Sequence, residues 1–463
     1  MLELFKATNN FVWGPPLLLL LVGTGVYFTI RLGLFQLSKL PTAFRLIFSS
    51  DQSGQGDVSS FAALCTALAA TVGTGNIVGV ATAITTGGPG ALFWMWVAAF
   101  FGMATKYAEG FLAIKYRTRD ADGHAAGGPM HYITIGMGQK WKPLAIFFAI
   151  SGVLVALLGI GTFSQVNSIT SSLEVSLGLS PQLISILLAI LVAVIIFGGI
   201  ETISKVSTKV VPFMAILYIL ATIVILITHA DQLIPALKLV VSSALTPSAA
   251  VGGFAGATVK EAIQRGIARG VFSNESGLGS APIAAAAAKS DNAVEQGLIS
   301  MTGTFIDTII ICSLTGLSIL VTGQWTVEGL EGAPLTQAAF ATVFGNPGTI
   351  ALTISLVLFA FTTILGWSYY GERCIEFLFG TKSILPYRLV FILMVALGGF
   401  LKLDLIWTIA DIVNGLMALP NLIALLALSP VIIKETRLYF QATHRKPSFI
   451  FSELFIKLIK KSS

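Results

Sequence analysis

The chain has 463 residues and a formal net charge of +6; 55% of its residues are hydrophobic and only 11% are charged. Soluble domains carry about 25% charged residues, so this composition excludes a soluble enzyme, a disordered regulator and a nucleic-acid-binding module. The 46 glycines are also too many for a simple membrane anchor. The mean hydropathy of +0.86 is typical of a polytopic helical membrane protein.

Apolar runs predict an all-α protein with eleven transmembrane helices. No secretory signal with an A-x-A-like cleavage site is expected before residue 30, so the first apolar run is expected to stay as a membrane span. In chain order the expected spans are 14–34, 61–86, 90–115, 143–170, 181–199, 208–228, 253–288, 296–321, 349–372, 386–401 and 404–429.

The distribution of Lys and Arg predicts the orientation in the membrane. If the N-terminus lies outside, 22 of the 28 Lys and Arg, Lys106 among them, fall in cytoplasmic segments and only 3 in outer ones. Cytoplasmic loops are enriched in these residues, so we expect a plasma-membrane protein with its C-terminus in the cytoplasm. Within the basic tail 431–463, the amphipathic segment Ile450 to Lys460 is either a helix on the inner leaflet or a solvated end.

The second span contains a glycine-rich polar stretch near its middle, Thr71 to Gly79 (TVGTGNIVG). Glycine weakens a helix by about 1 kcal/mol relative to alanine, and irregular backbone at membrane depth occurs only where it is buried in protein or lines a cavity. We therefore expect a broken helix at a binding site. The alternative is a packing face of small residues, but packing alone has no need of Thr74 and Asn76.

The seventh span is interrupted in the same way from Gly270 to Pro282 (GVFSNESGLGSAP). A charge at membrane depth is costly, so Glu275 is expected to face protein or water. The two interruptions lie five spans apart, which predicts that they cross the membrane in opposite directions. Interrupted spans at matching positions of two inverted halves indicate the binding site of a secondary transporter.

This pattern divides the single transport domain 1–463 into four parts. Residues 1–60 form a peripheral first span and loop, 61–228 the first inverted repeat, 250–430 the second, and 431–463 the basic tail.

The stretch Gly87 to Trp96 (GGPGALFWMW), continuing to Gly102, resembles the signature of the sodium:alanine symporters, also called the alanine/glycine:cation symporter family. The stretches TVGTGNIVG and FSNESGLG are similar to that family too, and the resemblance covers nearly the whole chain. It implies eleven spans, ten of them in the five-plus-five inverted-repeat fold of the leucine transporter. It also implies Na⁺-coupled uptake of a small neutral amino acid, mainly alanine or glycine, although some members prefer glutamine.

A zwitterionic substrate would need donors for its carboxylate and acceptors for its ammonium group. Amides at an unwound helix suit the carboxylate, and carbonyls of the seventh span, with one hydroxyl, suit the ammonium. The candidates are the amides of Thr74, Gly75 and Asn76, the carbonyls of Phe272, Ser273 and Asn274, and the Ser276 hydroxyl. By resemblance Gln165 of the fourth span also faces the substrate; the alternative is a hydrogen bond between helices.

Two adjacent threonines in the ninth span are candidate ligands for Na⁺, a hard cation that prefers oxygen. By resemblance to the usual ion site of this fold, the ligands are the hydroxyls of Thr362 and Thr363 and the carbonyls of Ala69, Val72 and Phe359. The alternative is that both hydroxyls merely bond to carbonyls of their own helix. Trp367, one turn further on, is expected either to cap the substrate cavity or to lie at the membrane interface.

Several charged residues inside the spans are functional candidates. Asp307 lies in the middle of the eighth span, and Asp411 is placed to pair with Arg269 as an outer gate. Glu109 is expected to be a structural residue at the cytoplasmic end of the third span. His124 and His131 are expected to be solvated loop residues.

The alternatives to a symporter are a membrane enzyme, a channel and a non-transporting amino-acid sensor. The sequence has no HExxH motif, no GxSxG motif and no P-loop, and no histidine lies in the core of a span. An enzyme is therefore not expected, and unwound helices in an inverted repeat favour a carrier over a channel. The expected partners are a small neutral amino acid, Na⁺ and the bilayer, with no obligate protein partner evident. The preferred amino acid, and H⁺ in place of Na⁺, stay open.

Overall fold

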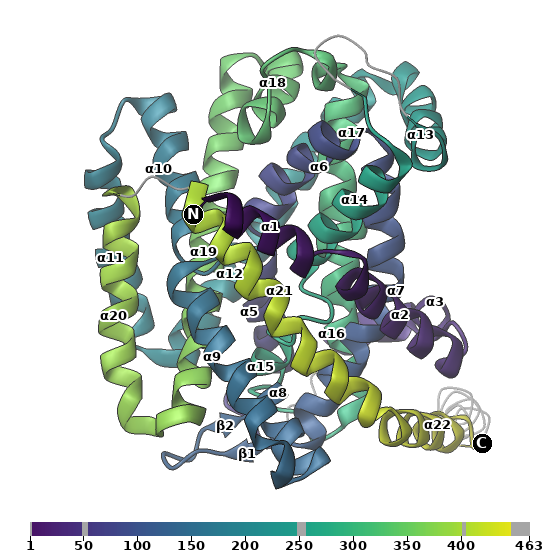
Figure 1. Cartoon of the computed structure of the whole chain (residues 1–463), viewed down its shortest axis with the longest axis vertical. Coiled ribbons are helices and arrows are strands. Elements are labelled where there is room, and N and C mark those ends of the chain that lie inside the picture. The colour runs from purple at the N-terminus through teal and green to yellow at the C-terminus, as the bar shows by residue number, and fades with distance from the viewer. Residues whose placement is uncertain (1, 49–53, 248–255, 401–403, 446–463) are drawn as a thin grey trace, which may run out of the picture.

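The computed structural model describes residues 2–48, 54–247, 256–400 and 404–445, and these are almost entirely helical (Figure 1). The described strands form one hairpin, β1 (Thr118–Arg119) and β2 (Ala125–Ala126), in which Thr118 pairs with Ala126. The hairpin lies at one end of the helical bundle, and the helices α13 (Ala230–Leu245) and α18 (Gly332–Phe344) lie at the other (Figure 1).

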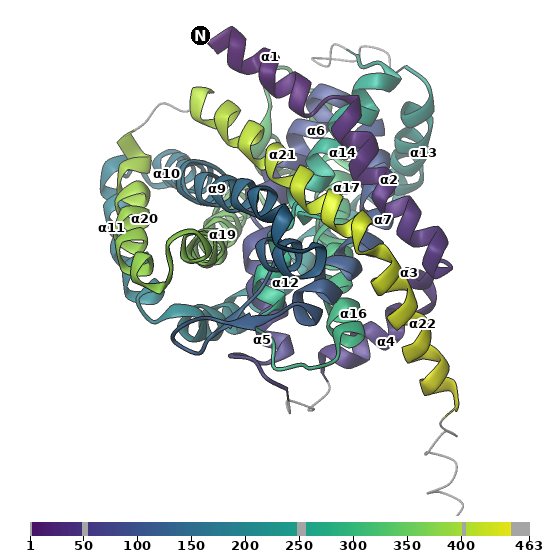
Figure 2. The same cartoon turned by 60° about the horizontal axis from the view of Figure 1, so that its bottom comes forward.

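Four helices precede the first repeat. They are α1 (Leu2–Val12), α2 (Pro15–Leu32), α3 (Phe35–Ser38) and α4 (Leu40–Ile47). Proline at the first position of α2 is typical of a helix start, and the left-handed Gly33 after its last residue is typical of a helix end. The helix α2 packs against α7 (Gly90–Lys115) and α21 (Asp404–Ala427), outside the two repeats (Figure 2).

The remaining helices of the first repeat correspond to the second to sixth predicted spans. They are α5 (Ser60–Thr71), the π-helical turn η1 (Gly75–Gly79), α6 (Val80–Gly87), α9 (Lys142–Leu158), α10 (Phe163–Leu177), α11 (Pro181–Ile196) and α12 (Gly199–Thr228). Between α7 and α9 lie α8 (Pro129–His131), η2 (Tyr132–Met137) and η3 (Gln139–Trp141).

The second repeat contains the seventh to eleventh predicted spans. They are α14 (Val259–Asn274) with α15 (Ala281–Ala285), then α16 (Ala293–Thr304), η4 (Phe305–Cys312) and α17 (Ser313–Val321), then α19 (Asn346–Phe379), α20 (Ile384–Leu397) and α21. Short turns η5 (Gln324–Thr326), η6 (Thr381–Ser383) and η7 (Gly398–Phe400) join them, and α22 (Ser429–Arg445) follows α21.

Both predicted interruptions are present. The axes of the two halves of the second span are bent by 52° between Thr71 and Gly75. The helix α14 ends where Glu275 adopts a left-handed conformation (φ 56°), and Gly277 and Gly279 also have positive φ before α15 begins. A glycine tolerates this conformation without steric cost, so the unwound segment 275–280 follows from the sequence as predicted.

Other parts of the chain differ from the predictions. The fourth predicted span is present within the candidate span Gln139–Leu177, but residues 159–162 interrupt it between α9 and α10. The first part of the predicted tail, from residue 431 to Arg445, belongs to the helix α22, which lies at an angle of 57° to α21. The helices α13 and α18 were not expected. The segment Ile450 to Lys460 and the first residues of the seventh predicted span lie outside the described residues.

The described residues contain seven helices long and apolar enough to span a membrane, or up to nine if two bent pairs each count as one span. The helix α11 is a shorter apolar helix, and the interrupted segment of α14 and α15 supplies the other unwound element. The fold class is therefore as predicted, while the count of eleven stays a prediction. Exposed Leu, Ile and Val side chains on α11, α12 and α20 provide the lipid-facing surface.

Candidate functional site

The two interrupted helices meet in the interior of the bundle. A Cβ atom added to Gly75 would lie 3.3 Å from the Cα atom of Ser273, so η1 and the end of α14 are in backbone contact. A cavity of about 230 Å³ opens beside this contact. Its lining residues are Thr74, Gly75, Val78, Gly79, Thr82, Arg269, Phe272, Thr408 and Asp411.

The inner wall of this cavity is the start of a helix. The first amides of a helix have no partner within it, and their dipole favours an anion. The Thr74 hydroxyl is also buried without a hydrogen-bond partner among the described residues. The Asn76 amide, by contrast, donates to the Gly73 carbonyl (3.3 Å). Of the three predicted carboxylate-binding residues, Thr74 and Gly75 therefore line the cavity, whereas Asn76 lies behind it.

Asp307 on η4 links both interrupted helices. Its carboxylate accepts hydrogen bonds from Asn76 Nδ2 (2.7 Å), Ser273 Oγ (2.9 Å) and the neighbouring Thr308 Oγ1 (2.7 Å). The side-chain oxygen of Asn76 accepts a bond from the Gly73 amide (2.9 Å). The whole cluster is buried, so this network fixes the unwound backbone around Gly73.

Asn274 and Ser276 extend the network toward α7. Asn274 Nδ2 donates to Thr308 Oγ1 (3.0 Å), and the Ser276 amide donates to Asn274 Oδ1 (2.9 Å). Lys106 Nζ donates to the Asn274 carbonyl (2.8 Å). Only 2% of Lys106 is exposed, so its assignment to a cytoplasmic segment was wrong. Its cationic head instead lies against the C-terminal carbonyls of α14, where the helix dipole favours positive charge.

Two acids hold the unwound segment 275–280. Glu109 Oε1 accepts bonds from the amides of Gly277 (3.1 Å) and Gly279 (3.0 Å) and from Asn421 Nδ2 (2.7 Å). Glu275 accepts bonds from the Ser280 hydroxyl and from Trp367 Nε1 (3.0 Å). Glu275 thus faces protein, as predicted. Glu109 has a structural role, as predicted, but it acts within the candidate site. The sequence feature that could have indicated this is its position three residues after Lys106 within an apolar run.

The predicted Na⁺ ligands lie around the end of α5, where the last carbonyls of the helix, including those of Ala69 and Val72, lack partners within it. A Cβ atom on Gly73 would lie 2.4 Å from Thr363 Oγ1 and 3.5 Å from Gln165 Oε1. The Thr362 and Thr363 hydroxyls both donate to the Phe359 carbonyl at 3.0 Å. This is the alternative given above, in which both hydroxyls bond to a carbonyl of their own helix.

Gln165 and Trp367 are both placed inside the protein. Gln165 Nε2 donates to the Ile160 carbonyl (3.0 Å), whereas its Oε1 atom is buried without a partner among the described residues. Trp367 is fully buried, so the expectation that it lies at the membrane interface was wrong. It is also not among the residues that line the 230 Å³ cavity; it supports Glu275 instead.

Arg269 and Asp411 flank the cavity and form the predicted pair, with 3.7 Å between Arg269 Nη2 and Asp411 Oδ2. The guanidinium carbon of Arg269 also lies 5.3 Å from the ring centroid of Phe272. The side chains of both charged residues are partly exposed, so the pair lies at the solvent side of the cavity. Its role as a gate stays a prediction.

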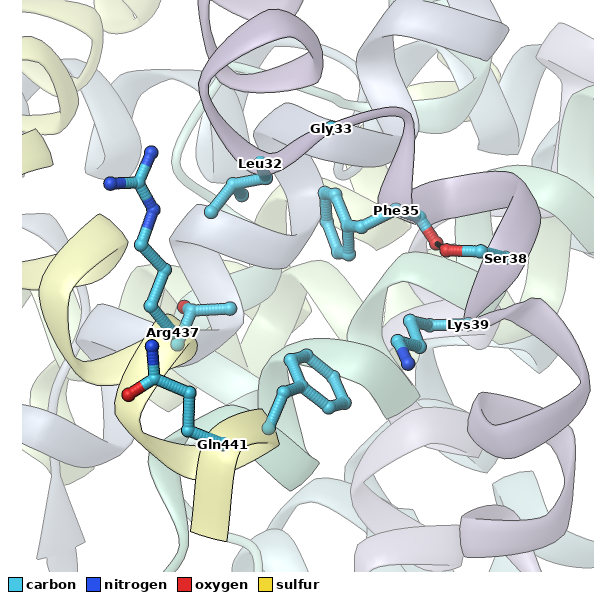
Figure 3. Close-up of a pocket in the computed structure, with 9 residues that line it drawn as sticks. Leu32, Gly33, Phe35, Ser38, Lys39, Arg437 and Gln441 are labelled. Carbon is cyan, nitrogen blue, oxygen red and sulfur yellow. Dashed lines mark hydrogen bonds between the residues drawn. The ribbon is translucent and has the colours of Figure 1, made fainter. Parts of the chain in front are cut away.

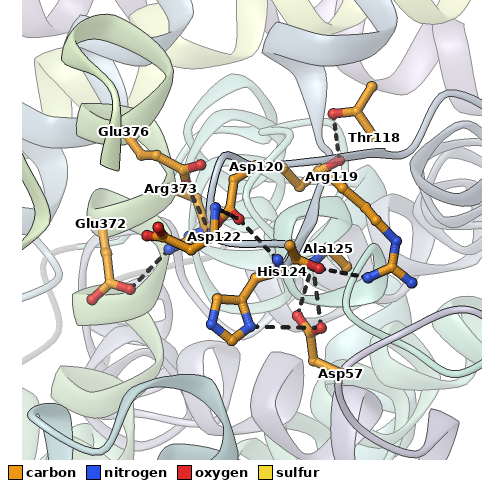
Figure 4. Close-up of polar contacts among 12 residues, drawn as sticks. Asp57, Thr118, Arg119, Asp120, Asp122, His124, Ala125, Glu372, Arg373 and Glu376 are labelled. Atoms are coloured by element: carbon orange, nitrogen blue, oxygen red, sulfur yellow. Dashed lines mark hydrogen bonds and ion pairs between the residues drawn. The ribbon is translucent and has the colours of Figure 1, made fainter. Parts of the chain in front are cut away.

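The hairpin end of the bundle is closed by a charged cluster centred on Arg373 (Figure 4). Arg373 Nη1 lies 3.0 Å from Asp120 Oδ2 and 2.8 Å from Glu376 Oε2, and its Nη2 lies 3.1 Å from Glu372 Oε1. Arg388 from α20 belongs to the same cluster, because its Nε atom lies 2.6 Å from Glu372 Oε2. Burial raises the pKa of Asp120, but the His124 amide and Arg373 outweigh it, and the net pKa lies below its ordinary value. Asp120 therefore stays ionised.

His131 near this cluster is not a solvated residue. Its Nδ1 atom lies 3.2 Å from Thr118 Oγ1, and its ring packs edge-on against Phe377 at 5.5 Å between centroids. Burial, reinforced by Arg373, lowers the pKa of His131 to about 4. The imidazole is therefore neutral at physiological pH. His124, in contrast, is exposed as expected.

The segments that flank the interrupted spans also meet at the hairpin end. The amides of Asp57 and Val58 donate to the Ala287 carbonyl at 2.9 and 3.0 Å. Arg117 donates from Nη1 to the Ala288 carbonyl (2.7 Å) and from Nη2 to Asp291 (3.0 Å). These contacts close the hairpin side, while the opposite side holds the cavity.

Comparison with known proteins identifies the family of this chain. Residues 1–452 match the family described as "Sodium:alanine symporter family". The chain belongs to the sodium:alanine symporter family. It is therefore a multi-pass membrane transporter that couples amino-acid uptake to Na⁺, as the resemblance implied, rather than an enzyme.

Relatives of this symporter are similar over almost their whole length. It is 56% identical to an uncharacterized transporter of Haemophilus influenzae, with 95% of this chain and 96% of the relative covered. It is 51% identical to the sodium/alanine symporter AgcS of Methanococcus maripaludis (94% and 97% covered). It is 38% identical to the probable sodium/glutamine symporter GlnT of Bacillus subtilis (93% and 89% covered).

Solved structures show the fold of the symporter at low sequence identity. The crystal structure of MhsT in complex with L-phenylalanine superposes with a TM-score of 0.56 and 13% identity, covering 83% of this chain and 99% of that one. A substrate-bound, outward-open Na⁺-coupled sialic acid symporter gives a TM-score of 0.50 and 14% identity, covering 88% and 80%. The leucine-transporter-like fold is therefore confirmed.

Proposed function

We propose that this symporter carries alanine, and next glycine, into the cell together with Na⁺ by alternating access. The observation that carries the proposal is the cavity of about 230 Å³ that ends at the unwound helix start Thr74–Gly75. This cavity brings the helix-start backbone of Thr74 and Gly75, a hydroxyl without a partner among the described residues and the apolar side chain of Phe272 to one place. The 51% identity to a sodium/alanine symporter favours alanine as the substrate.

In this proposal the substrate carboxylate binds the amides of Thr74 and Gly75, and Asn76 holds that backbone in place. The ammonium group binds the carbonyls of Phe272 and Ser273 at the end of α14, since the Asn274 carbonyl already accepts a hydrogen bond from Lys106. The buried Gln165 Oε1 atom has no partner among the described residues and is a further acceptor available to the ammonium group. Ser276, Trp367 and Asp307 position these groups and do not bind substrate themselves.

Na⁺ would bind where the end of α5 meets α19. The carbonyls of Ala69 and Val72 lie at the negative end of the α5 dipole, which favours a cation. The Phe359 carbonyl and the hydroxyls of Thr362 and Thr363 complete the set. Both hydroxyls can keep donating to Phe359 while their lone pairs face the ion, because a hydroxyl both donates and accepts.

We further propose that the cavity opens to the outside of the plasma membrane, with the N-terminus outside and the C-terminus in the cytoplasm. The repeats 61–228 and 250–430 would then move against each other, with 1–60 peripheral and 431–463 cytoplasmic. Arg269 and Asp411 form the outer gate, and the Arg373 cluster holds the inner side closed. Moving one Na⁺ through about 100 mV supplies about 2.3 kcal/mol, enough for roughly fortyfold accumulation.

Uptake of labelled alanine into proteoliposomes, driven by inward Na⁺ or choline gradients, tests this proposal. Wild-type protein should accumulate alanine only with Na⁺, and Thr362→Val should raise the Na⁺ concentration needed for half-maximal uptake at least tenfold. The matched control is Thr222→Val, since Thr222 is equally buried and its hydroxyl donates only to the Tyr218 and Ile219 carbonyls of α12.

The competitors glycine, serine and glutamine rank the substrates in the same assay. Uptake of glutamine in place of alanine would correct the substrate but keep the mechanism. Uptake driven by a proton gradient without Na⁺ would instead assign coupling to a buried acid, and Asp307 is the first candidate. Binding without any uptake would favour an amino-acid sensor and overturn the transport proposal.

A further inference from the structure

A second, larger cavity lies away from the substrate site, between the end of α2, the helix α3 and the helix α22 (Figure 3). Its volume is about 570 Å³. The lining residues are Leu32, Gly33, Phe35, Ser38, Lys39, Thr436, Arg437, Phe440 and Gln441. In Figure 3 Lys39 and Arg437 stand on opposite sides of this cavity, with Leu32 and Phe35 between them.

The positive charges of this cavity have no counter-ion in the described part of the chain. Lys39 Nζ lies 4.3 Å from the centroid of the Phe440 ring, and Arg437 Nη2 donates to the Arg31 carbonyl (3.1 Å). Neither side chain forms an ion pair with a described carboxylate. The nearby acid on α22, Glu435, is already paired with Lys115 at 2.6 Å. Both cations are therefore available to bind an anion from outside the described residues.

The cavity lies where the apolar part of a span ends. The 18 residues of α2 are almost entirely apolar until Arg31, which is in the last turn. Large apolar side chains remain exposed beside the cavity, namely Leu34 (52%), Leu37 (58%) and Leu438 (53%). Cations next to exposed leucines at the end of a span are typical of the depth at which lipid headgroups meet acyl chains.

We propose that this cavity binds the phosphate headgroup of an anionic phospholipid, with Lys39 and Arg437 as the phosphate ligands. The acyl chains would run along the exposed leucines of α3 and α22, which explains why these apolar side chains face outward. The chain's own tail is a poor source of this anion, because residues 446–463 contain four lysines and one glutamate and are therefore net basic. This site is independent of the substrate cavity and of the coupling ion.

Native mass spectrometry of the full-length protein, titrated with phosphatidylglycerol or phosphatidylcholine, tests the site. Wild-type protein should bind one phosphatidylglycerol more tightly than the rest. Each cation near an anionic surface contributes about 1 kcal/mol, so Lys39→Gln with Arg437→Gln should weaken this binding about thirtyfold. The matched control, Lys140→Gln with Lys142→Gln, removes the same charge from exposed residues elsewhere and should leave this binding unchanged.

Two further variants keep the test decisive if the double glutamine variant does not fold. Ser38→Trp fills the cavity from an exposed position and should displace the lipid, while Lys39→Arg with Arg437→Lys should retain it. Three results would overturn the proposal: equal binding of the two lipids, an equal loss in the control variant, or displacement of the lipid by millimolar inorganic phosphate. The last would show a site for a free anion.

Discussion

Asp307 and Asn76 are 231 positions apart in the sequence, yet the Asp307 carboxylate accepts a 2.7 Å hydrogen bond from the Asn76 side chain at the centre of the protein. The same carboxylate holds Ser273, so one acid connects both interrupted helices. In this fold, a change at Asp307 reaches the proposed substrate site through the backbone around Gly73.

Asp307→Ala is therefore expected to lower alanine uptake at least about tenfold. The substitution removes the carboxylate that accepts from Asn76, Ser273 and Thr308, and leaves Asn76 and Ser273 with only the weaker contacts to the Asp307 carbonyl and the Cys312 sulfur. A buried donor left unsatisfied costs about 1–3 kcal/mol. Asp307→Asn should retain more uptake, because the Ser273 and Thr308 hydroxyls can accept hydrogen bonds from the new amide group where they donated to the carboxylate. Initial uptake rates at equal protein in the liposomes measure the effect, and Asp231→Ala on exposed α13 is the control. Full uptake by Asp307→Ala would contradict this role.

Gly73→Ala should abolish uptake, because the added methyl group would lie 2.4 Å from Thr363 Oγ1. Gly303→Ala is the matched control, since its methyl group would meet its nearest neighbour, Leu64, at an ordinary 3.8 Å. Adding Thr363→Ala to Gly73→Ala removes the clash and should restore the thermal stability in detergent but not the Na⁺ dependence. Normal transport by Gly73→Ala alone would show that the two helices do not approach this closely.

Exchanging the charges of Arg269 and Asp411 tests the outer gate. Each single reversal, Arg269→Asp or Asp411→Arg, should lower the uptake rate, because it replaces the opposite-charge pair, 3.7 Å apart in the native protein, with two like charges that face each other. The double variant should recover part of that rate. A double variant no better than either single one would rule out a gate based on their pairing.

Arg373→Ala should destabilise the protein by about 3 kcal/mol or more, because it leaves buried carboxylates without their cation. Asp120 and Glu376 would lose their cation, whereas Glu372 would keep its ion pair with Arg388. The control is Lys205→Ala, whose partner Glu201 is 64% exposed and which should change stability by less than about 0.5 kcal/mol. The unfolding midpoints in detergent compare the two variants, and equal midpoints would count against the cluster.

The buried imidazole of His131 should make the folded protein less stable in mild acid. Its pKa is about 4 in the folded protein and near 6.5 when unfolded, so the unfolded chain takes up the proton first as the pH falls. Stability from the neutral imidazole is complete above pH 6.5 and is lost toward pH 4; at pH 5 the loss is about 2 kcal/mol. The unfolding midpoint should therefore fall less between pH 8 and pH 5 in His131→Gln than in wild type. Parallel midpoints would exclude this contribution.

The interruptions of the second and seventh spans could be predicted because they depend on a few consecutive residues. Glycines and polar residues within an apolar run weaken the helix locally, whatever surrounds it. The same reasoning could have found the break between α9 and α10, where Gly159 and Gly161 are close together. The helices α13 and α18 were not predicted, because they lie between the long apolar runs that define the spans.

The membrane class, the family and the two broken helices could be predicted from the amino-acid sequence, since composition, motifs and local backbone preference are properties of neighbouring residues. The partners of the buried charges became known from the folded structure alone. Lys106 and Glu109 find their partners about 170 positions away, at Asn274 and Gly279. A buried charge is stabilised by groups that folding brings to it, and no local pattern specifies which groups those are.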